Sequence, residues 1–327
     1  MAEENDLLTG PTWQDLLGPT RRAEAEQRMN MRCWIGTEDP EPWVSPEVDR
    51  ECLEMAYVLL ALISPVTAPG CDREAMIVYG TLSALLDTGA TKLREFSEDE
   101  LLKRNFRGRP VEEWAQRAAA GLDEWTRTTL LEGFRIQIAQ LKEIRVESGP
   151  GAGAARYSAN ATSYPEYIRW RTREGWYWGG LLACAVISGI DLREVPTQWI
   201  EETLEASVLA FDIHGSLRHA FENEVGHTLH YLPGTQHEKV TACLNAYNEI
   251  LFRLQDAEDL TPPAKEYLLR FITGLVGAAY ACRRYNKTTP LHVARPEDIQ
   301  IGWTHIDAAP TYRQTFDQVT AHTRLDN

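Results

Sequence analysis

EYIRWRTREG, residues Glu166 to Gly175, runs without interruption into the apolar segment Trp176 to Gly189. On a helix, Arg171 and the acid Glu174 share one face, and Gly175 follows directly. Gly175 is the first of three glycines within six residues, each of which weakens a helix by about 1 kcal/mol relative to alanine. The stretch therefore predicts a helix with a central kink, in an arrangement suited to sensing an anion there.

The residues at the predicted kink are aromatic, because Trp176, Tyr177 and Trp178 follow one another. A kink exposes carbonyl oxygens and ring faces, and each ring face stabilises a cation by about 0.5 to 2 kcal/mol. The alternative is that the glycines let helices pack closely and the tryptophans fill the core. Taken alone, these residues leave both interpretations open.

Helical periodicity continues on both sides of this segment. Apolar residues recur at three- and four-residue spacing, and proline and glycine mark the breaks. Strand-like alternation is confined to a weak patch near Ile299 to Ile306. We predict an all-α fold, a helical bundle around a central cavity. The predicted helices are Pro46 to Leu62, Arg73 to Arg94, Val111 to Ile144, Pro165 to Ser188, Pro196 to Tyr231, His237 to Gln255 and Pro262 to Tyr285.

The composition favours one large domain. The chain has 327 residues and is 43% hydrophobic, which is enough for a substantial core. Prolines and charges are frequent in residues 1–45, which we interpret as an N-terminal arm. Residues 46–327 then form a single helical domain.

Charge and targeting signals restrict the partners and the location. A net charge of −15 argues against nucleic acid or anionic lipid as the main partner. The six cysteines are scattered and predict reduced, buried thiols. The acidic N-terminus lacks the features of a signal peptide, and the longest apolar run, Met55 to Val66, is too short to span a membrane. We expect a cytoplasmic protein that is not embedded in a membrane.

The segment from Pro165 to Val195 resembles the helix-G region of class I terpene synthases, which carries an E-Y-L-x-x-R-x-x-(D/T)-x-G pattern before a helix break. The resemblance implies that Arg171 senses the substrate diphosphate, that Glu174 links it to the break, and that Gly175 turns its carbonyl toward the ionising carbon. Further along, Arg284 and Tyr285 resemble the arginine-tyrosine pair that bonds the diphosphate when the site closes. The similarity covers roughly Tyr79 to Tyr285.

The metal motifs of this family are only partly present. Asp87 stands where the first aspartate of the aspartate-rich box is expected, and a helix-end aspartate is the alternative. In the second box the best register by spacing is Ser216, Ala220 and Glu224, and Asp212 lies one turn earlier on the same helix face. The resemblance implies Mg²⁺ held by these oxygens, in a cluster smaller than the usual three ions.

Three other interpretations of the second box remain. A competing register uses Asp212 with Gly215 and His219, and a hydrogen-bonded polar face without metal is also compatible with the sequence. Glu224 and His227 form a Glu-x-x-His unit, which di-iron bundles use in pairs, but the sequence has no second copy.

The function implied by the resemblance is that of a carbon-oxygen lyase in isoprenoid secondary metabolism. It would ionise an isoprenyl diphosphate, with farnesyl diphosphate favoured, and cyclise the cation to a sesquiterpene. The chamber would be lined by residues such as Phe134, Trp176, Trp178 and Phe211, and a homodimer is expected by analogy. The degenerate metal boxes are similar in kind to those of divergent fungal cyclases of humulene-type and meroterpenoid pathways.

Other classes of function compete with a cyclase. A chain-elongating prenyltransferase would show two aspartate-rich boxes, which this chain lacks. A non-catalytic all-α interaction protein, or an inactive relative of the cyclases, is the main alternative.

Overall fold

The computed structural model describes residues 46–65, 67–88, 96–146, 168, 170–172, 175–221, 228 and 234–281. Of this described part, 78% is helical. Its strands are limited to the two-residue β1 (Asn105–Phe106) and β2 (Arg109–Pro110), which pair antiparallel. The all-α prediction is therefore confirmed. The arm at residues 1–45 and the strand-like patch near residue 300 lie outside the described residues.

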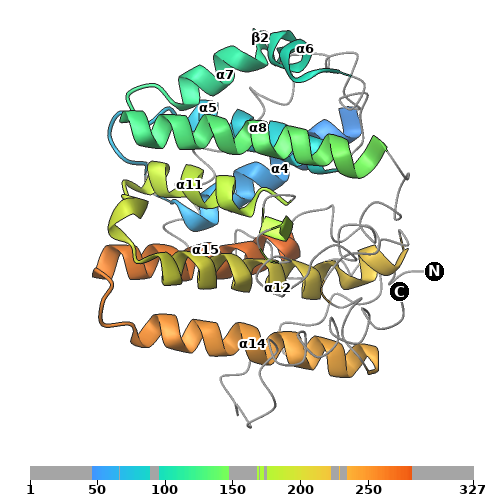
Figure 1. Cartoon of the computed structure of the whole chain (residues 1–327), viewed down its shortest axis with the longest axis vertical. Coiled ribbons are helices and arrows are strands. Elements are labelled where there is room, and N and C mark those ends of the chain that lie inside the picture. Colours follow the sequence, from blue (N-terminus) through green and yellow to red (C-terminus); the bar gives the residue numbers. More distant parts are fainter. Residues whose placement is uncertain are drawn as a thin grey trace, which may run out of the picture.

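The long helices lie side by side in layers (Figure 1), with α8 at one end of the stack, α14 at the other and α11 between. Four pairs make the most extensive contacts: α4 with α5, α12 with α15, α12 with α14, and α15 with α4. The helices are α4 (Pro46–Ile63), α5 (Arg73–Thr88), α6 (Glu98–Lys103), α7 (Val111–Ala118), α8 (Glu124–Val146), α11 (Tyr177–Ser188), the 3-10 helix η3 (Leu192–Glu194), α12 (Thr197–Phe221), α14 (Gln236–Asp256) and α15 (Pro262–Ala281).

Several predicted helix starts agree with the structure. α4, α5 and α15 begin at the predicted residues, and proline opens two of them, since a missing N–H costs nothing in the first turn. α14 begins one residue before the prediction. There Thr235 and Glu238 form a capping box, in which each side chain accepts the backbone N–H of the other residue.

The single helix predicted from Val111 to Ile144 is wrong, because the chain breaks between α7 and α8. Gly121 has a φ of 77°, a left-handed conformation that glycine adopts without strain. Two residues later, the Asp123 carboxylate accepts the backbone N–H of Thr126 at 3.2 Å and so caps the start of α8. The glycine and the aspartate were both visible in the sequence, but the apolar spacing continues across them.

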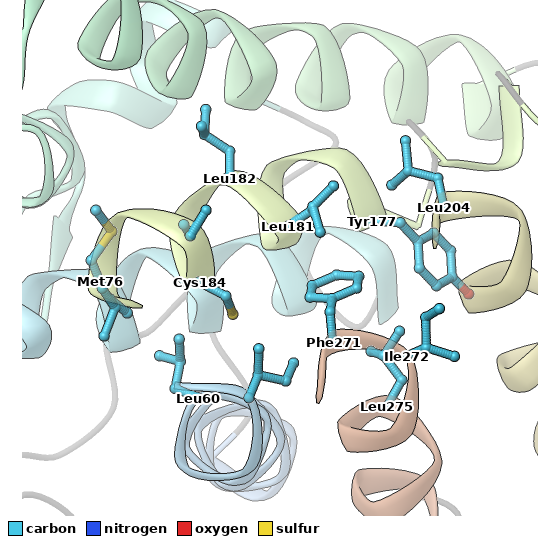
Figure 2. Packing of buried hydrophobic residues seen from close by; sticks show 14 of the residues in the cluster. Leu60, Met76, Tyr177, Leu181, Leu182, Cys184, Leu204, Phe271, Ile272 and Leu275 are labelled. Carbon is cyan, nitrogen blue, oxygen red and sulfur yellow. The ribbon is translucent and has the colours of Figure 1, made fainter. Parts of the chain in front are cut away.

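The core is built around α11, which is apolar on all sides (Figure 2). Phe271 and Ile272 of α15 point toward it from one side, and Leu60 of α4 lies below it in the view of Figure 2. Buried hydrogen bonds join α11 to its neighbours. The Tyr267 hydroxyl donates to the Leu181 carbonyl, and the Ser64 hydroxyl donates to a second α11 carbonyl at 2.8 Å. α11 is therefore held at the centre of the bundle.

The described cysteines are free thiols. Cys52, Cys184 and Cys243 are buried, as predicted, whereas Cys71 is half-buried. Among the described helices, none combines the length and the apolar character that a membrane-spanning segment needs.

Candidate functional site

The predicted kink is present between Gly175 and α11. The Gly175 N–H donates to the Arg171 carbonyl at 3.0 Å, with the spacing of a helical hydrogen bond. Trp176 then has φ 56° and ψ 23°, a left-handed conformation that is rare for a bulky residue. α11 starts at the next residue, and the Gly180 N–H returns to the Trp176 carbonyl at 2.8 Å. The prediction of a helix break at this position is confirmed.

The glycines around the break make room for aromatic side chains. A Cβ added at Gly175 would overlap the ring of Tyr177, and one at Gly179 would overlap the indole of Trp176. The Trp176 indole also packs edge-to-face against Tyr79, with ring centroids 5.4 Å apart. Close packing therefore accounts for these two glycines, in agreement with the alternative given by the sequence. It does not account for Arg171.

Arg171 forms a buried ion pair with Asp212 of α12. The arginine Nη2 lies 3.0 Å from the aspartate Oδ1. The Asp212 side chain is completely buried, and only 13% of the Arg171 side chain is exposed. The backbone N–H of Thr228 donates to the other aspartate oxygen, Oδ2, at 2.6 Å. Residues 41 positions apart thus meet directly, with the carboxylate fixed from two sides.

Three of the described residues near this ion pair are uncharged, namely Phe211, His214 and Cys243. The ring of Phe211 packs edge-to-face on Tyr177, with centroids 5.3 Å apart. Burial lowers the pKa of His214 to about 4, so its imidazole is neutral at pH 7. Burial raises the pKa of the Cys243 thiol well above its usual range, and the nearby Asp212 carboxylate raises it further. At this degree of burial an ion pair interacts more strongly than it would in water.

The structure describes only part of the predicted site. Arg171, Gly175 and Asp212 lie in the described part, and the side chains of Arg171 and Asp212 are in contact. Asp87 lies in the last turn of α5 and Ser216 one turn after Asp212 in α12, but their side chains are outside the described residues. Four predicted residues lie outside them entirely: Glu174, Glu224, Arg284 and Tyr285.

The metal-binding role predicted for Asp212 does not fit this arrangement. Both of its oxygens accept hydrogen bonds, one from a guanidinium group whose positive charge repels a cation. Within the described ranges, no three His, Cys, Asp or Glu side chains lie close enough together to hold a metal ion. Asp212 could bind Mg²⁺ only after Arg171 had moved away.

The sequence reasoning missed the pairing of Arg171 with Asp212 and the part played by Thr228. One signal was available for the pairing: Asp212 interrupts an apolar run of α12, where an unpartnered carboxylate would be costly to bury. No side chain could have indicated Thr228, because it contributes its backbone N–H.

A second ion pair on α12 lies far from the first. Arg253 of α14 donates from Nη2 to the buried Glu202 at 3.1 Å, and it also contacts Glu249. Glu249 and Arg253 line a shallow hollow of about 530 Å³ on the outer face, together with Trp199 and the segment 256–259. This pair provides a comparison for Arg171 and Asp212, because it joins the same helix to a different neighbour.

No protein-family model matches the sequence, and no match was found among the curated proteins. The function must therefore be argued from the residues and their geometry. The feature that requires an explanation beyond packing is a largely buried arginine beside a helix break, facing a buried carboxylate.

Proposed function

We propose that the chain is a class I terpene cyclase that ionises an isoprenyl diphosphate, with farnesyl diphosphate favoured, and cyclises the resulting cation to a sesquiterpene. The observation that carries the proposal is the position of Arg171. It lies one turn before a helix break, in an all-helical core, with a small part of its side chain still exposed. The terpene synthase resemblance assigns the diphosphate sensor to this residue.

A guanidinium group suits a departing diphosphate. It offers five N–H donors in a planar fork that matches phosphate oxygens, and its positive charge persists at every physiological pH. In a site from which water is largely excluded, such a group stabilises developing negative charge more strongly than it would in solution. Arg171 would therefore bind and orient the diphosphate at the edge of the core.

The surroundings of the break suit the other product of ionisation, an allylic cation. The rings of Trp176, Tyr177 and Phe211 lie at or beside the break, and aromatic faces attract cations. Apolar side chains next to these rings keep water away, which would otherwise trap the cation before it cyclised. The same residues can thus pack the core and line a cation chamber.

The proposed reaction uses Mg²⁺, which neutralises charge on the departing diphosphate. Asp87, Ser216 and Glu224 would hold the metal, because carboxylate and hydroxyl oxygens are the ligands that Mg²⁺ prefers. Asp212 is not included in this set, since its oxygens are engaged by Arg171 and by the Thr228 N–H.

The test is incubation of the purified chain with geranyl, farnesyl and geranylgeranyl diphosphates, with Mg²⁺ and with a chelator. We expect a cyclic C15 product by gas chromatography and matching release of pyrophosphate, both lost when the metal is chelated. The absence of product and of pyrophosphate release with all three substrates would reject the proposal.

A non-catalytic protein or an inactive cyclase relative is the second candidate. Two observations favour it: Ala220 occupies a ligand position of the second metal box, and the Arg171–Asp212 pair engages both charged groups. Such a protein would bind inorganic pyrophosphate or an isoprenyl diphosphate without turning it over. Binding measured together with the incubation above separates this candidate from an active cyclase.

A further inference from the structure

We propose that Asp212 is a positioning residue for Arg171 rather than a metal ligand. Its carboxylate holds the guanidinium in the resting protein and releases it to the phosphate oxygens of an incoming diphosphate. The choice of a diphosphate as the anion rests on the proposed function. The exchange itself follows from the geometry of the three residues Arg171, Asp212 and Thr228.

The contacts indicate which partner moves. Asp212 is completely buried and is held on its far oxygen by the Thr228 N–H at 2.6 Å, so it cannot follow the guanidinium. Arg171 has a long, flexible side chain, of which 13% already reaches the surface. When an anion arrives from the exposed side, the guanidinium is therefore the group that shifts, and the carboxylate stays in place.

The pair also restricts which anions bind. While the carboxylate lies 3.0 Å from the guanidinium, the charges of the two groups cancel, and a weakly charged anion gains little by approaching. A diphosphate carries several negative charges and can form two parallel hydrogen bonds with the guanidinium, so it competes with a carboxylate. Asp212 therefore lowers the affinity for all anions and makes high charge density a condition of binding.

A matched control exists on the same helix. Glu202 is also a buried carboxylate of α12, and it accepts hydrogen bonds from Arg253 Nε and Nη2 at 3.2 and 3.1 Å. It lies about three helical turns before Asp212, a separation of roughly 15 Å. Glu202→Gln removes the same charge and breaks the same kind of pair without touching Arg171.

Calorimetric titration of the full chain with inorganic pyrophosphate, with and without Mg²⁺, tests the proposal. We expect Asp212→Asn to bind pyrophosphate about tenfold more tightly than the wild type, a difference of about 1.4 kcal/mol. Glu202→Gln should match the wild type, and adding Arg171→Ala to Asp212→Asn should abolish the gain. A residue that only supported the fold would give no gain in affinity.

Unchanged or weaker binding by Asp212→Asn overturns the proposal, and a loss seen only with Mg²⁺ would identify a metal ligand instead. If Asp212→Asn does not fold, the guanidinium NMR signals of the wild-type chain serve as the measurement. Pyrophosphate should shift the signal of Arg171, identified with Arg171→Lys, and leave that of Arg253 in place. An unshifted Arg171 signal also overturns the proposal.

The outcomes separate this inference from the proposed function. Tighter pyrophosphate binding by Asp212→Asn, without any terpene product from the wild type, supports the inference and rejects the cyclase. A cyclic product from the wild type, without any gain in Asp212→Asn, rejects the inference and leaves the cyclase standing.

Discussion

Gly179 and Trp176 occupy adjoining space, because a Cβ at position 179 would overlap three atoms of the Trp176 indole. The indole lies in turn against Tyr79, so the position of this side chain depends on the missing Cβ. This relationship links the sequence pattern at the helix break to the packing of the core. A substitution that adds a Cβ at position 179 tests this relationship.

Gly179→Ala is expected to destabilise the protein by about 1 to 3 kcal/mol, because the indole must leave its place in a filled core. Gly180→Ala is the control, since a Cβ there would meet the same indole at an ordinary distance of 3.7 Å. Urea unfolding followed by tryptophan fluorescence measures both variants. Equal stability of the two would show that the Trp176 indole is not confined by Gly179.

The contact between α15 and α4 gives a second prediction. A Cβ at Gly274 would come within 2.6 Å of the Ile63 side chain, whereas Gly133 of α8 has nothing within 4 Å. We expect Gly274→Ala to lower the free energy of unfolding by about 1 to 3 kcal/mol. Gly133→Ala should raise it by up to about 1 kcal/mol through helix propensity. Thermal unfolding followed by circular dichroism compares the two, and a stable Gly274→Ala variant would contradict close packing of these helices.

The ion pair between Arg171 and Asp212 predicts strong coupling. Either residue changed alone, as Arg171→Met or Asp212→Leu, removes the ion-pair partner of the remaining buried charge and should cost about 3 to 5 kcal/mol. The double variant should lose much less than the sum of the two. Urea denaturation of the four proteins in a double-mutant cycle measures the coupling.

The same cycle applied to Glu202 and Arg253 provides the comparison. Because 39% of the Arg253 side chain is exposed, solvent screens this pair, and we expect a coupling energy near 1 kcal/mol or below. Equal coupling in the two cycles would contradict the special burial of the Arg171–Asp212 pair.

Cys184 predicts a loss of stability in alkali. Burial raises the pKa of its thiol from 9.0 to about 12, so the folded state keeps the proton after the unfolded chain has released it. The contribution of this thiol is complete below about pH 9 and declines as the pH rises toward 12, by up to about 1.4 kcal/mol per pH unit. Urea unfolding at pH 8, 9 and 10 should show a shallower decline for Cys184→Ala than for the wild type. Parallel curves would argue against a buried, protonated thiol.

Local features of the fold were predictable from the sequence. Apolar spacing and proline positions gave the starts of α4, α5 and α15, because helix formation and helix starts depend on neighbouring residues. The glycines gave the break at Gly175 for the same reason. The break between α7 and α8 was missed because the apolar spacing continues across Gly121. In the structure this glycine has a positive φ, which interrupts the right-handed helical conformation.

The site was less predictable because it depends on contacts between distant segments. Arg171 and Asp212 were both identified as functional candidates, but their contact depends on how the arginine-bearing turn packs against α12. The order of residue types along the chain does not show how these two distant segments pack against each other. The Thr228 N–H is a backbone donor that almost any residue type could have supplied, so its position could come only from the structure.

Trp176, with its left-handed backbone conformation, lies between α11 and the turn that carries Arg171. Most residues of α11 are buried, so this helix cannot rotate without disturbing the core. Between that turn and α11, Trp176 has a φ of 56°, so the two segments do not continue as one straight helix. The direction in which α11 leaves the Arg171 turn therefore depends on one strained residue, whose cost of about 1 to 3 kcal/mol must be offset by the packing of the core around it.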